Sequence, residues 1–211
     1  MKPVTLLNID CIEYMRTVQD KYFDLTLTDF PYGIDENYGQ YIDTQENLIW
    51  LVNNAMPEIL RISRVVALTP GVKNMYLYPK PDWVMAWVTP AGTGNSSWGF
   101  CCWQPILLYG KDPYLAKGKG SMPDYFLWTG SAEKTNHPCN KPITIWKKIL
   151  KRVMIDSGRI FDPFMGSGTT AICAYDYCCE FVGCELDKDY YDAAVKRFNY
   201  HKSQVNMFEE K

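Results

Sequence analysis

A loop of four residues, Asp29-Phe30-Pro31-Tyr32, combines the groups best suited to chemistry in this chain. The exocyclic amine of adenine or cytosine is a poor nucleophile because its lone pair is delocalised into the ring. The Asp29 carboxylate and the Phe30 carbonyl would accept its two N–H bonds, aim the lone pair at an electrophilic methyl group and stabilise the developing positive charge. Pro31 keeps Phe30 extended, and Tyr32 offers a flat face to a base turned out of its stack. The same residue types form ordinary surface turns, so the loop alone leaves that alternative open.

A second segment, residues 162–171, has the sequence Asp-Pro-Phe-Met-Gly-Ser-Gly-Thr-Thr-Ala and joins a predicted strand to a predicted helix. Gly166 and Gly168 let the backbone approach a ligand, and the helix N-terminus presents free N–H groups. Glu185 ends the next predicted strand, roughly 20 residues on, where such units hold two ribose hydroxyls. The unit could bind a dinucleotide or a nucleoside methyl donor without phosphate. It could also be a tight turn between a strand and a helix that binds no ligand. Its place late in the chain favours the methyl donor, because nicotinamide enzymes usually carry it at the start of their nucleotide domain.

Strands and helices are predicted to alternate along the chain, which favours an α/β sheet with mostly parallel strands. The predicted strands are Val4 to Ile9, Phe23 to Thr28, Val65 to Leu68, Trp83 to Val88, Ile106 to Tyr109, Arg159 to Asp162 and Phe181 to Cys184. The predicted helices run from the N-cap Thr44 to Ile62, and over Ile143 to Met154, Thr169 to Tyr177 and Asp189 to His201. Both candidate segments follow a strand directly, so we expect them at the carboxyl edge of the sheet, where open α/β folds bind ligands.

Length and composition predict one domain, residues 1–211, with a substantial core. The net charge of −2 means that any contact with nucleic acid must come from a local patch. Residues 134–152 contain six basic residues and no acid, which is also typical of a solvated helix face. The 8 cysteines lack C-x-x-C spacing, so no metal site is predicted. No signal peptide or bilayer-length apolar run is present, so we expect an intracellular protein without a membrane partner.

Four motifs together resemble the amino-methyltransferases of DNA, which act on adenine N6 or cytosine N4. Residues 29–32 match the catalytic signature (Asp/Asn/Ser)-Pro-Pro-(Tyr/Phe) except at Phe30, and residues 162–169 match the cofactor signature Asp-Pro-Phe-x-Gly-x-Gly-Thr. Residues 137–142 match His-Pro-x-x-Lys-Pro, and Asn8-Ile9-Asp10-Cys11 is similar to an Asp-Cys segment whose acid contacts the adenine of the cofactor. The catalytic loop precedes the cofactor turn, an order that resembles the circularly permuted β group of these enzymes.

The resemblance implies a Rossmann-like class I fold of S-adenosylmethionine-dependent methyltransferases, with a mostly parallel seven-stranded sheet and helices on both faces. It implies that Asp29, Phe30, Pro31 and Tyr32 carry catalysis. The cofactor would bind Asp10, Cys11, Asp29, Lys141, Asp162, Pro163, Phe164, Gly166, Gly168, Thr169, Glu185 and Leu186. Lys111 to Thr135, which is rich in Gly, Pro and Lys, is predicted to be loop or a small target-recognition insertion. We expect nucleic acid to contact Lys111, Lys117, Lys119, Lys134 and His137.

The implied activity is methyl transfer from S-adenosylmethionine to a DNA base, with adenine N6 favoured over cytosine N4 because Asp opens the catalytic loop. An enzyme acting on RNA or a protein amide is an alternative, although that chemistry usually opens with Asn and is not permuted. A nicotinamide or flavin oxidoreductase would explain the glycine turn but give Asp29 no task. A DNA-binding protein without activity is disfavoured by the net charge. The short recognition region leaves room for a homodimer partner or a specificity subunit, and is typical of a stand-alone enzyme from a bacterium or phage.

Overall fold

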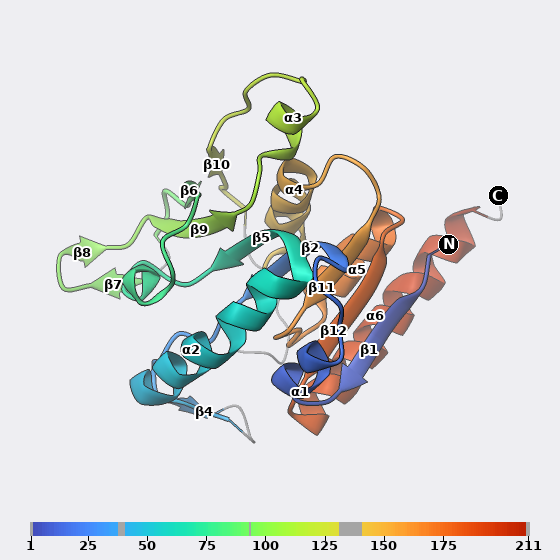
Figure 1. The fold of residues 1–211 in the computed structure, drawn as a ribbon, viewed down its shortest axis with the longest axis horizontal. Coiled ribbons are helices and arrows are strands. Elements are labelled where there is room, and N and C mark those ends of the chain that lie inside the picture. Colours follow the sequence, from blue (N-terminus) through green and yellow to red (C-terminus); the bar gives the residue numbers. More distant parts are fainter. Residues whose placement is uncertain (1, 38–40, 93, 131–140, 210–211) are drawn as a thin grey trace.

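The computed structural model describes residues 2–37, 41–92, 94–130 and 141–209. Its centre is an eight-stranded sheet with the order β1-β12-β11-β2-β5-β9-β6-β10 (Figure 1). Its strands are β1 (Val4–Asn8), β12 (Glu180–Glu185), β11 (Arg159–Asp162), β2 (Phe23–Asp29), β5 (Ser63–Thr69), β9 (Trp103–Tyr109), β6 (Trp83–Val88) and β10 (Tyr125–Leu127). Because helices cover both faces of the sheet, a central strand such as β2 is apolar or Thr-rich along almost its whole length.

The direction of each strand decides which loops can reach the candidate site. β1, β12, β11, β2 and β5 form a parallel series. β9 is antiparallel to both β5 and β6, so β6 points the same way as β2 and β5 while β9 points the other way. The order of the chain reverses between β11 and β2, which is the topological switch point where open α/β sheets form a ligand crevice.

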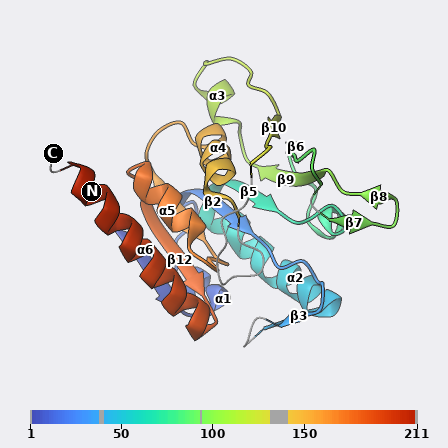
Figure 2. The same cartoon turned by 180° about the vertical axis from the view of Figure 1, so that it is seen from behind.

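Helices cover the two faces of the sheet. α1 (Cys11–Arg16) and α2 (Gln45–Ile62) pack on one face and share a buried core with Val66 and Phe161. α4 (Ile143–Val153), α5 (Thr169–Asp176) and α6 (Lys188–Glu209) pack on the other face, as Figure 2 shows from behind. Among the described residues, no helix has the length and apolar character needed to cross a bilayer.

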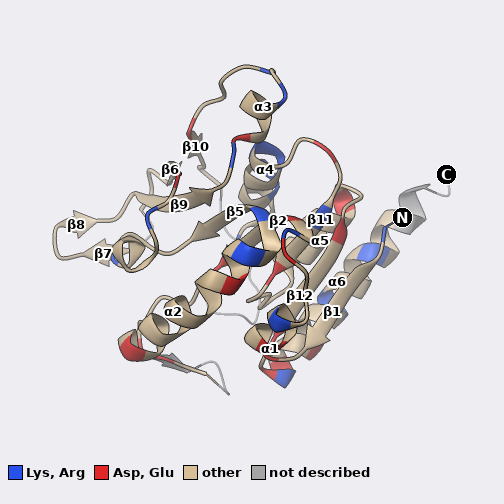
Figure 3. Ribbon diagram, in the orientation of Figure 1, with Lys and Arg blue, Asp and Glu red and all other residues tan. Residues whose placement is uncertain are grey.

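The predicted α/β class, the mostly parallel sheet and the helices on both faces are confirmed. Each of the seven predicted strands forms, and Thr44 caps α2 by accepting the Asn47 N–H at 3.1 Å. Several short elements were not predicted. These are α1, the hairpins β3 (Glu36–Asn37)–β4 (Ile42–Asp43) and β7 (Asn95–Ser96)–β8 (Gly99–Phe100), the 3₁₀ helix η1 (Met75–Leu77), α3 (Pro113–Ala116) and β10. β10 makes an eighth strand inside the segment predicted as loop, because it pairs with the open edge of β6. The β7–β8 hairpin carries none of the charged residues coloured in Figure 3.

Candidate active site

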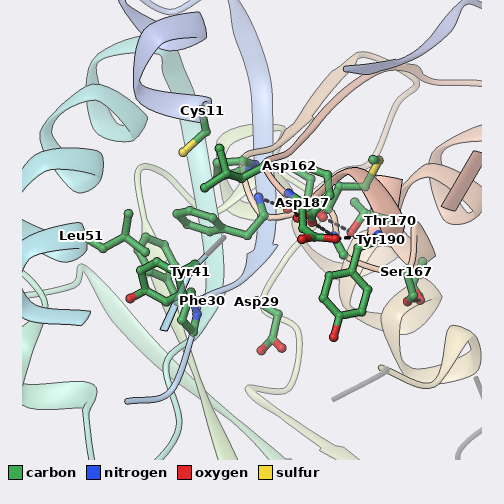
Figure 4. Close-up of a pocket in the computed structure, with 18 of the residues that line it drawn as sticks. Cys11, Asp29, Phe30, Tyr41, Leu51, Asp162, Ser167, Thr170, Asp187 and Tyr190 are labelled. Atoms are coloured by element: carbon green, nitrogen blue, oxygen red, sulfur yellow. Dashed lines mark hydrogen bonds between the residues drawn. The ribbon is translucent and has the colours of Figure 1, made fainter. Parts of the chain in front are cut away.

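A cavity of about 260 Å³ opens at the carboxyl edge of the sheet, beside the switch point between β11 and β2. Side chains from several distant parts of the chain surround it, as Figure 4 shows for Cys11, Asp29, Phe30, Asp162 and Tyr190. Parallel strands bring these segments together, because their carboxyl ends meet at one edge. The two segments singled out for their chemistry therefore line one cavity.

Asp29 is the last residue of β2, and its register partner on β5 is Thr69. Asp29 Oδ1 accepts hydrogen bonds from the hydroxyls of Tyr32 and Thr69. Its Oδ2 accepts from Lys141 Nζ at 2.5 Å, in an ion pair whose side chains are 18% and 13% exposed. Lys141 Nζ also lies 4.9 Å from the centre of the Tyr32 ring. The Asp29 carboxylate is thus held in one orientation by donors on both of its oxygens.

The backbone of the loop of residues 29–33 is held by Asp43, which is 0% exposed. Its carboxylate accepts the N–H groups of Gly33 at 2.8 Å and Tyr32 at 3.0 Å. Burial raises the pKa of Asp43, while these backbone donors lower it. Asn74 Nδ2 donates to the Tyr32 carbonyl at 2.5 Å from the loop that follows β5. The loop is therefore a fixed structure rather than an ordinary surface turn.

Phe30 stands where the related catalytic signature has its first proline, and its ring is 1% exposed. The ring packs edge-on against Tyr78 at 5.2 Å and against Phe164 of the glycine turn at 4.6 Å between centroids. Such aromatic pairs are favourable beyond the area they bury. Packing thus restrains Phe30 where a proline ring would otherwise restrict the backbone, and it joins the catalytic loop to the glycine turn.

Asp162 ends β11 and lies beneath the cavity in a hydrogen-bonded network. It accepts the hydroxyls of Thr28 at 2.7 Å and Thr170 at 2.5 Å, and the Phe164 N–H at 3.1 Å. Thr170 in turn accepts the indole N–H of Trp146 at 2.9 Å. Burial raises the pKa of Asp162 to about 6, against the lowering effect of the Thr170 and Thr28 hydroxyls. Its main visible role is to connect β2, β11, α4 and α5 under the site.

Glu185 ends β12 and holds the glycine turn. Its carboxylate accepts the N–H groups of Gly166 at 2.9 Å and Asp187 at 3.0 Å, and burial raises its pKa. Gly168 does not line the cavity. It has a φ of +76°, and a Cβ there would lie 3.3 Å from the Cβ of Ala194 on α6, so its glycine is required by backbone geometry and helix packing.

Asp10 and Cys11 form a further part of the cavity wall, besides the loop of residues 29–32 and the glycine turn. Asp10 Oδ1 caps α1 by accepting the N–H groups of Ile12 at 2.7 Å and Glu13 at 3.1 Å. Burial raises the pKa of the Cys11 thiol, which keeps it neutral and unreactive. This wall is formed by the turn between β1 and α1, which the predicted Asp-Cys segment occupies.

The charges in the cavity wall discriminate between ligand classes. The acidic side chains of the wall are Asp10, Asp29, Asp162, Glu185 and Asp187. Among the described residues, Lys141 is the one cation in the wall, and it is paired with Asp29. A doubly charged pyrophosphate would be repelled there, whereas a nucleoside with a positive group would be attracted. Within the described part of the chain, no cluster of His, Cys, Asp and Glu is arranged as a metal site.

Of the residues predicted to bind the cofactor, all but Gly168 lie in the cavity wall. The residues expected to contact nucleic acid are not brought there. Lys134 and His137 lie outside the described residues. Lys111, Lys117 and Lys119 follow β9, which ends at the amino edge of the sheet, and Lys117 pairs with Asp156 just before β11. These lysines therefore lie on the edge opposite to the catalytic loop, near α3 at the top of Figure 1.

The basic run is largely structural where it is described. Lys147 pairs with Asp176 of α5 at 2.6 Å, and Arg152, which is buried, pairs with Asp112 at 2.6 Å. These contacts anchor α4 to α5 and to the segment before α3. They explain Lys147 and Arg152 without a phosphate ligand, while Lys148 and Lys151 of the same run are exposed.

Several residues of the site were not predicted. Thr69 could have been found, because it directly follows the predicted strand Val65 to Leu68 and so lies at the carboxyl edge of the sheet. Asp43 and Asn74 gave no signal, since their contacts with the loop join segments far apart in sequence. Tyr41, Trp50 and Tyr190 also line the cavity, and nothing in their local sequence distinguishes them from core aromatics.

The matching family model and the similar proteins all concern methylases or methyltransferases. A family model described as DNA methylase (N6_N4_Mtase) matches residues 86–196, slightly more than half of the chain, and includes the glycine turn and Glu185. The YubD protein of Escherichia coli (strain K12), whose name carries the word methylase, is 27% identical over 206 residues, which cover 89% of this chain and 87% of YubD. The type II methyltransferase M.ScaI of Streptomyces caespitosus is 22% identical over 249 residues, covering 92% of this chain and 81% of M.ScaI.

Solved structures share the fold. The PvuII DNA methyltransferase, described as cytosine-N4-specific, superposes with a TM-score of 0.71 at 13% identity, covering 92% of this chain and 87% of that one. The M1.HpyAVI complex with SAM superposes with a TM-score of 0.63 at 21% identity, covering 92% of this chain and 100% of that one. At these identities the match concerns the arrangement of strands and helices.

Proposed function

The chain belongs to the DNA methylase family, and from that premise we propose that it transfers the methyl group of S-adenosylmethionine to adenine N6 in DNA. The observation that carries the proposal is the position of Asp29. Its carboxylate is fixed at the end of β2, in the wall of an acidic cavity that also contains the glycine turn and Glu185. Chemistry on an exocyclic amine needs this combination of an oriented acceptor and an adjacent nucleoside site.

The residues of the cavity suit the methyl donor. When bound, S-adenosylmethionine supplies a methyl group activated by a positively charged sulfur. Glu185 would hold its ribose hydroxyls, Phe164 and Leu186 would flank its adenine, and Lys141 would face its carboxylate. The excess of acidic side chains over the single described cation favours the positive charge of this donor over a pyrophosphate.

The chain's own groups would then prepare the base. The Asp29 carboxylate and the Phe30 carbonyl would accept the two N–H bonds of the target amine, and Tyr32 would stack on the base. Lys141 now lies over the Tyr32 ring and pairs with Asp29, so an entering base would have to displace its ammonium group. Asp43 and Asn74 would keep the Tyr32 backbone in place while this exchange occurs.

Adenine N6 is the finer part of the proposal and rests on the acid that opens the loop, since Ser is the usual opening residue of the cytosine enzymes. Further parts of the proposal are the single domain, a homodimer or specificity subunit, and a recognition role for residues 111–135. Within that segment β10 runs parallel to β6 and ends at the carboxyl edge, whereas Lys111, Lys117 and Lys119 lie at the other edge.

Labelled methyl transfer tests the proposal. Duplex DNA would be incubated with the protein and S-adenosylmethionine carrying a labelled methyl group, digested to nucleosides and separated. We expect the label in N6-methyl-2′-deoxyadenosine. Label in N4-methyl-2′-deoxycytidine would contradict the choice of base, and calorimetric binding of NAD with no binding of S-adenosylmethionine would contradict the cofactor and the reaction.

A further inference from the structure

The β7–β8 hairpin projects from the same edge of the sheet as the catalytic loop. β6 runs parallel to β2 and β5, so the connection from Val88 to Trp103 leaves the sheet at its carboxyl edge. Figure 1 shows the hairpin extending beyond the body of the molecule, at the end away from α6. It therefore lies at the same edge of the sheet as the candidate active site, and β6, which leads into it, is the third strand from β2 in the sheet order.

The hairpin presents two aromatic rings to solvent. Trp98 is 98% exposed and Phe100 is 80% exposed. The turn that carries them is braced, because Ser96 Oγ accepts the Trp98 N–H at 3.1 Å and donates to the Gly99 carbonyl at 3.0 Å. Its base is tied by the bonds from the Thr89 N–H to the Cys102 carbonyl and from the Cys101 N–H to the Gly94 carbonyl, both 2.8 Å. A partner would therefore meet a preformed surface and pay little to order it.

The loops at the β6 end of this edge carry no acidic side chain that would repel a polyanion. Residues 89–102 contain no charged side chain, and residues 70–77, which follow β5 at the same edge, contain Lys73 and no acid. Lys73 is exposed, and Tyr76 beside it is 86% exposed. In Figure 3 the hairpin is uniformly uncharged while acidic residues lie elsewhere. In a chain with net charge −2, these loops form a surface that does not repel phosphates.

We propose that the β7–β8 hairpin docks on the DNA duplex to one side of the target base, with Trp98 and Phe100 entering a groove. The proposal rests on the proposed function, which supplies the duplex. Apolar side chains can wedge between base steps, and aromatic rings stack on any base because each base has a π-face. The hairpin takes the place of Lys111, Lys117 and Lys119, which lie on the opposite edge. Such contacts would bind DNA without requiring a long recognition sequence.

The test compares single substitutions in the full chain. Trp98→Ala and Phe100→Ala would be measured for duplex affinity by fluorescence anisotropy with a labelled oligonucleotide, and for affinity to S-adenosylmethionine by calorimetry. Tyr200→Ala is the matched control, because Tyr200 is a similarly exposed aromatic on α6, and Lys117→Ala controls for the opposite edge. We expect Trp98→Ala to weaken duplex binding about tenfold, within the range for loss of one aromatic stack, with methyl-donor affinity unchanged. Both controls should bind DNA as the wild type does.

Each outcome decides between named alternatives. Wild-type duplex affinity in Trp98→Ala and Phe100→Ala, in a protein that methylates DNA, would overturn the docking role and leave the proposed function intact. If Trp98→Ala sediments as a monomer where the wild type sediments as a dimer, and its duplex affinity per subunit is unchanged, the docking role on DNA is overturned. The hairpin would then bind a second copy of the chain. A wild-type protein that binds the methyl donor but neither binds nor methylates DNA would overturn the proposed function itself.

Discussion

Lys141 Nζ lies 2.5 Å from Asp29 Oδ2, although the two residues are 112 positions apart in the sequence. The contact joins the segment before α4 to the end of β2, and both residues line the cavity. The same ammonium lies over the ring of Tyr32. One cation thus covers both the carboxylate and the aromatic face that the proposed reaction requires, and it must move or share its partner when substrates bind.

Lys141→Gln should weaken the binding of S-adenosylmethionine about tenfold or more, because the cavity loses the described cation that would face the ligand's carboxylate. 5′-Methylthioadenosine lacks the amino-acid portion, so its affinity should barely change. Calorimetry with both ligands checks this, with Lys148→Gln, an exposed neighbour on α4, as the control. Equal losses of affinity for the two ligands would show that Lys141 maintains the shape of the site and does not bind the ligand's carboxylate.

Thr69→Val should lower kcat about tenfold, because it removes a hydroxyl that donates to the Asp29 carboxylate while keeping a similar volume. Thr26→Val is a matched control on the same pair of strands. The Thr26 and Ser63 hydroxyls share a hydrogen bond of 2.6 Å, and neither residue lines the cavity. The control should reduce the free energy of unfolding but leave kcat per folded molecule unchanged. Comparable kcat in Thr69→Val and wild type would remove Thr69 from the positioning of Asp29.

Phe30→Ala should reduce the free energy of unfolding by about 3 kcal/mol or more, because a fully buried ring between Tyr78 and Phe164 is lost. The variant should also lose activity, since the Phe30 carbonyl is no longer restrained by packing. Phe30→Leu keeps most of the apolar volume and should recover much of both quantities. Urea unfolding and kcat measured on the same samples test this; a stability loss below that of an exposed aromatic such as Tyr200→Ala would contradict the packing role.

Asp162→Asn should change how stability depends on pH. Burial raises the pKa of Asp162 to about 6, above the value of about 3.9 for an unfolded aspartate. A raised carboxyl pKa favours folding at low pH, and this contribution is lost as pH rises from about 4 through 6. The wild type should lose about 2 kcal/mol more than the variant over that interval. Denaturant unfolding at pH 4 and pH 7 measures the difference, and parallel curves for the two proteins would contradict the assignment.

The sequence predicted most of the framework because its main elements have strong local signals. β5 and α2 were found from a buried apolar run and from apolar residues at helical spacing after an N-cap. The glycine turn was found because only particular residues fit between a strand and a ligand-binding helix. The short strands of the β7–β8 hairpin and β10 are too brief to show alternation, so the sequence could not reveal them.

Positions within the site were predicted better than their partners. Asp29 and Glu185 lie in the cavity wall as expected, but the hydrogen bonds that hold Asp29 come from Thr69 and Lys141 on separate elements. The lysines after β9 were expected to contact DNA because they lie in the segment predicted to be a target-recognition insertion. The reversed direction of β9 carries them to the other edge, and strand direction is set by sheet pairing that local sequence does not encode.

The most direct test of the account is Asp29→Ala, assayed for labelled methyl transfer to duplex DNA and for calorimetric binding of S-adenosylmethionine. Loss of an oriented acceptor in the transition state should reduce transfer by about 100-fold or more, while donor affinity stays within about threefold of wild type. Transfer close to the wild-type rate would remove Asp29 from the mechanism and contradict the central claim that this carboxyl-edge loop is the active site.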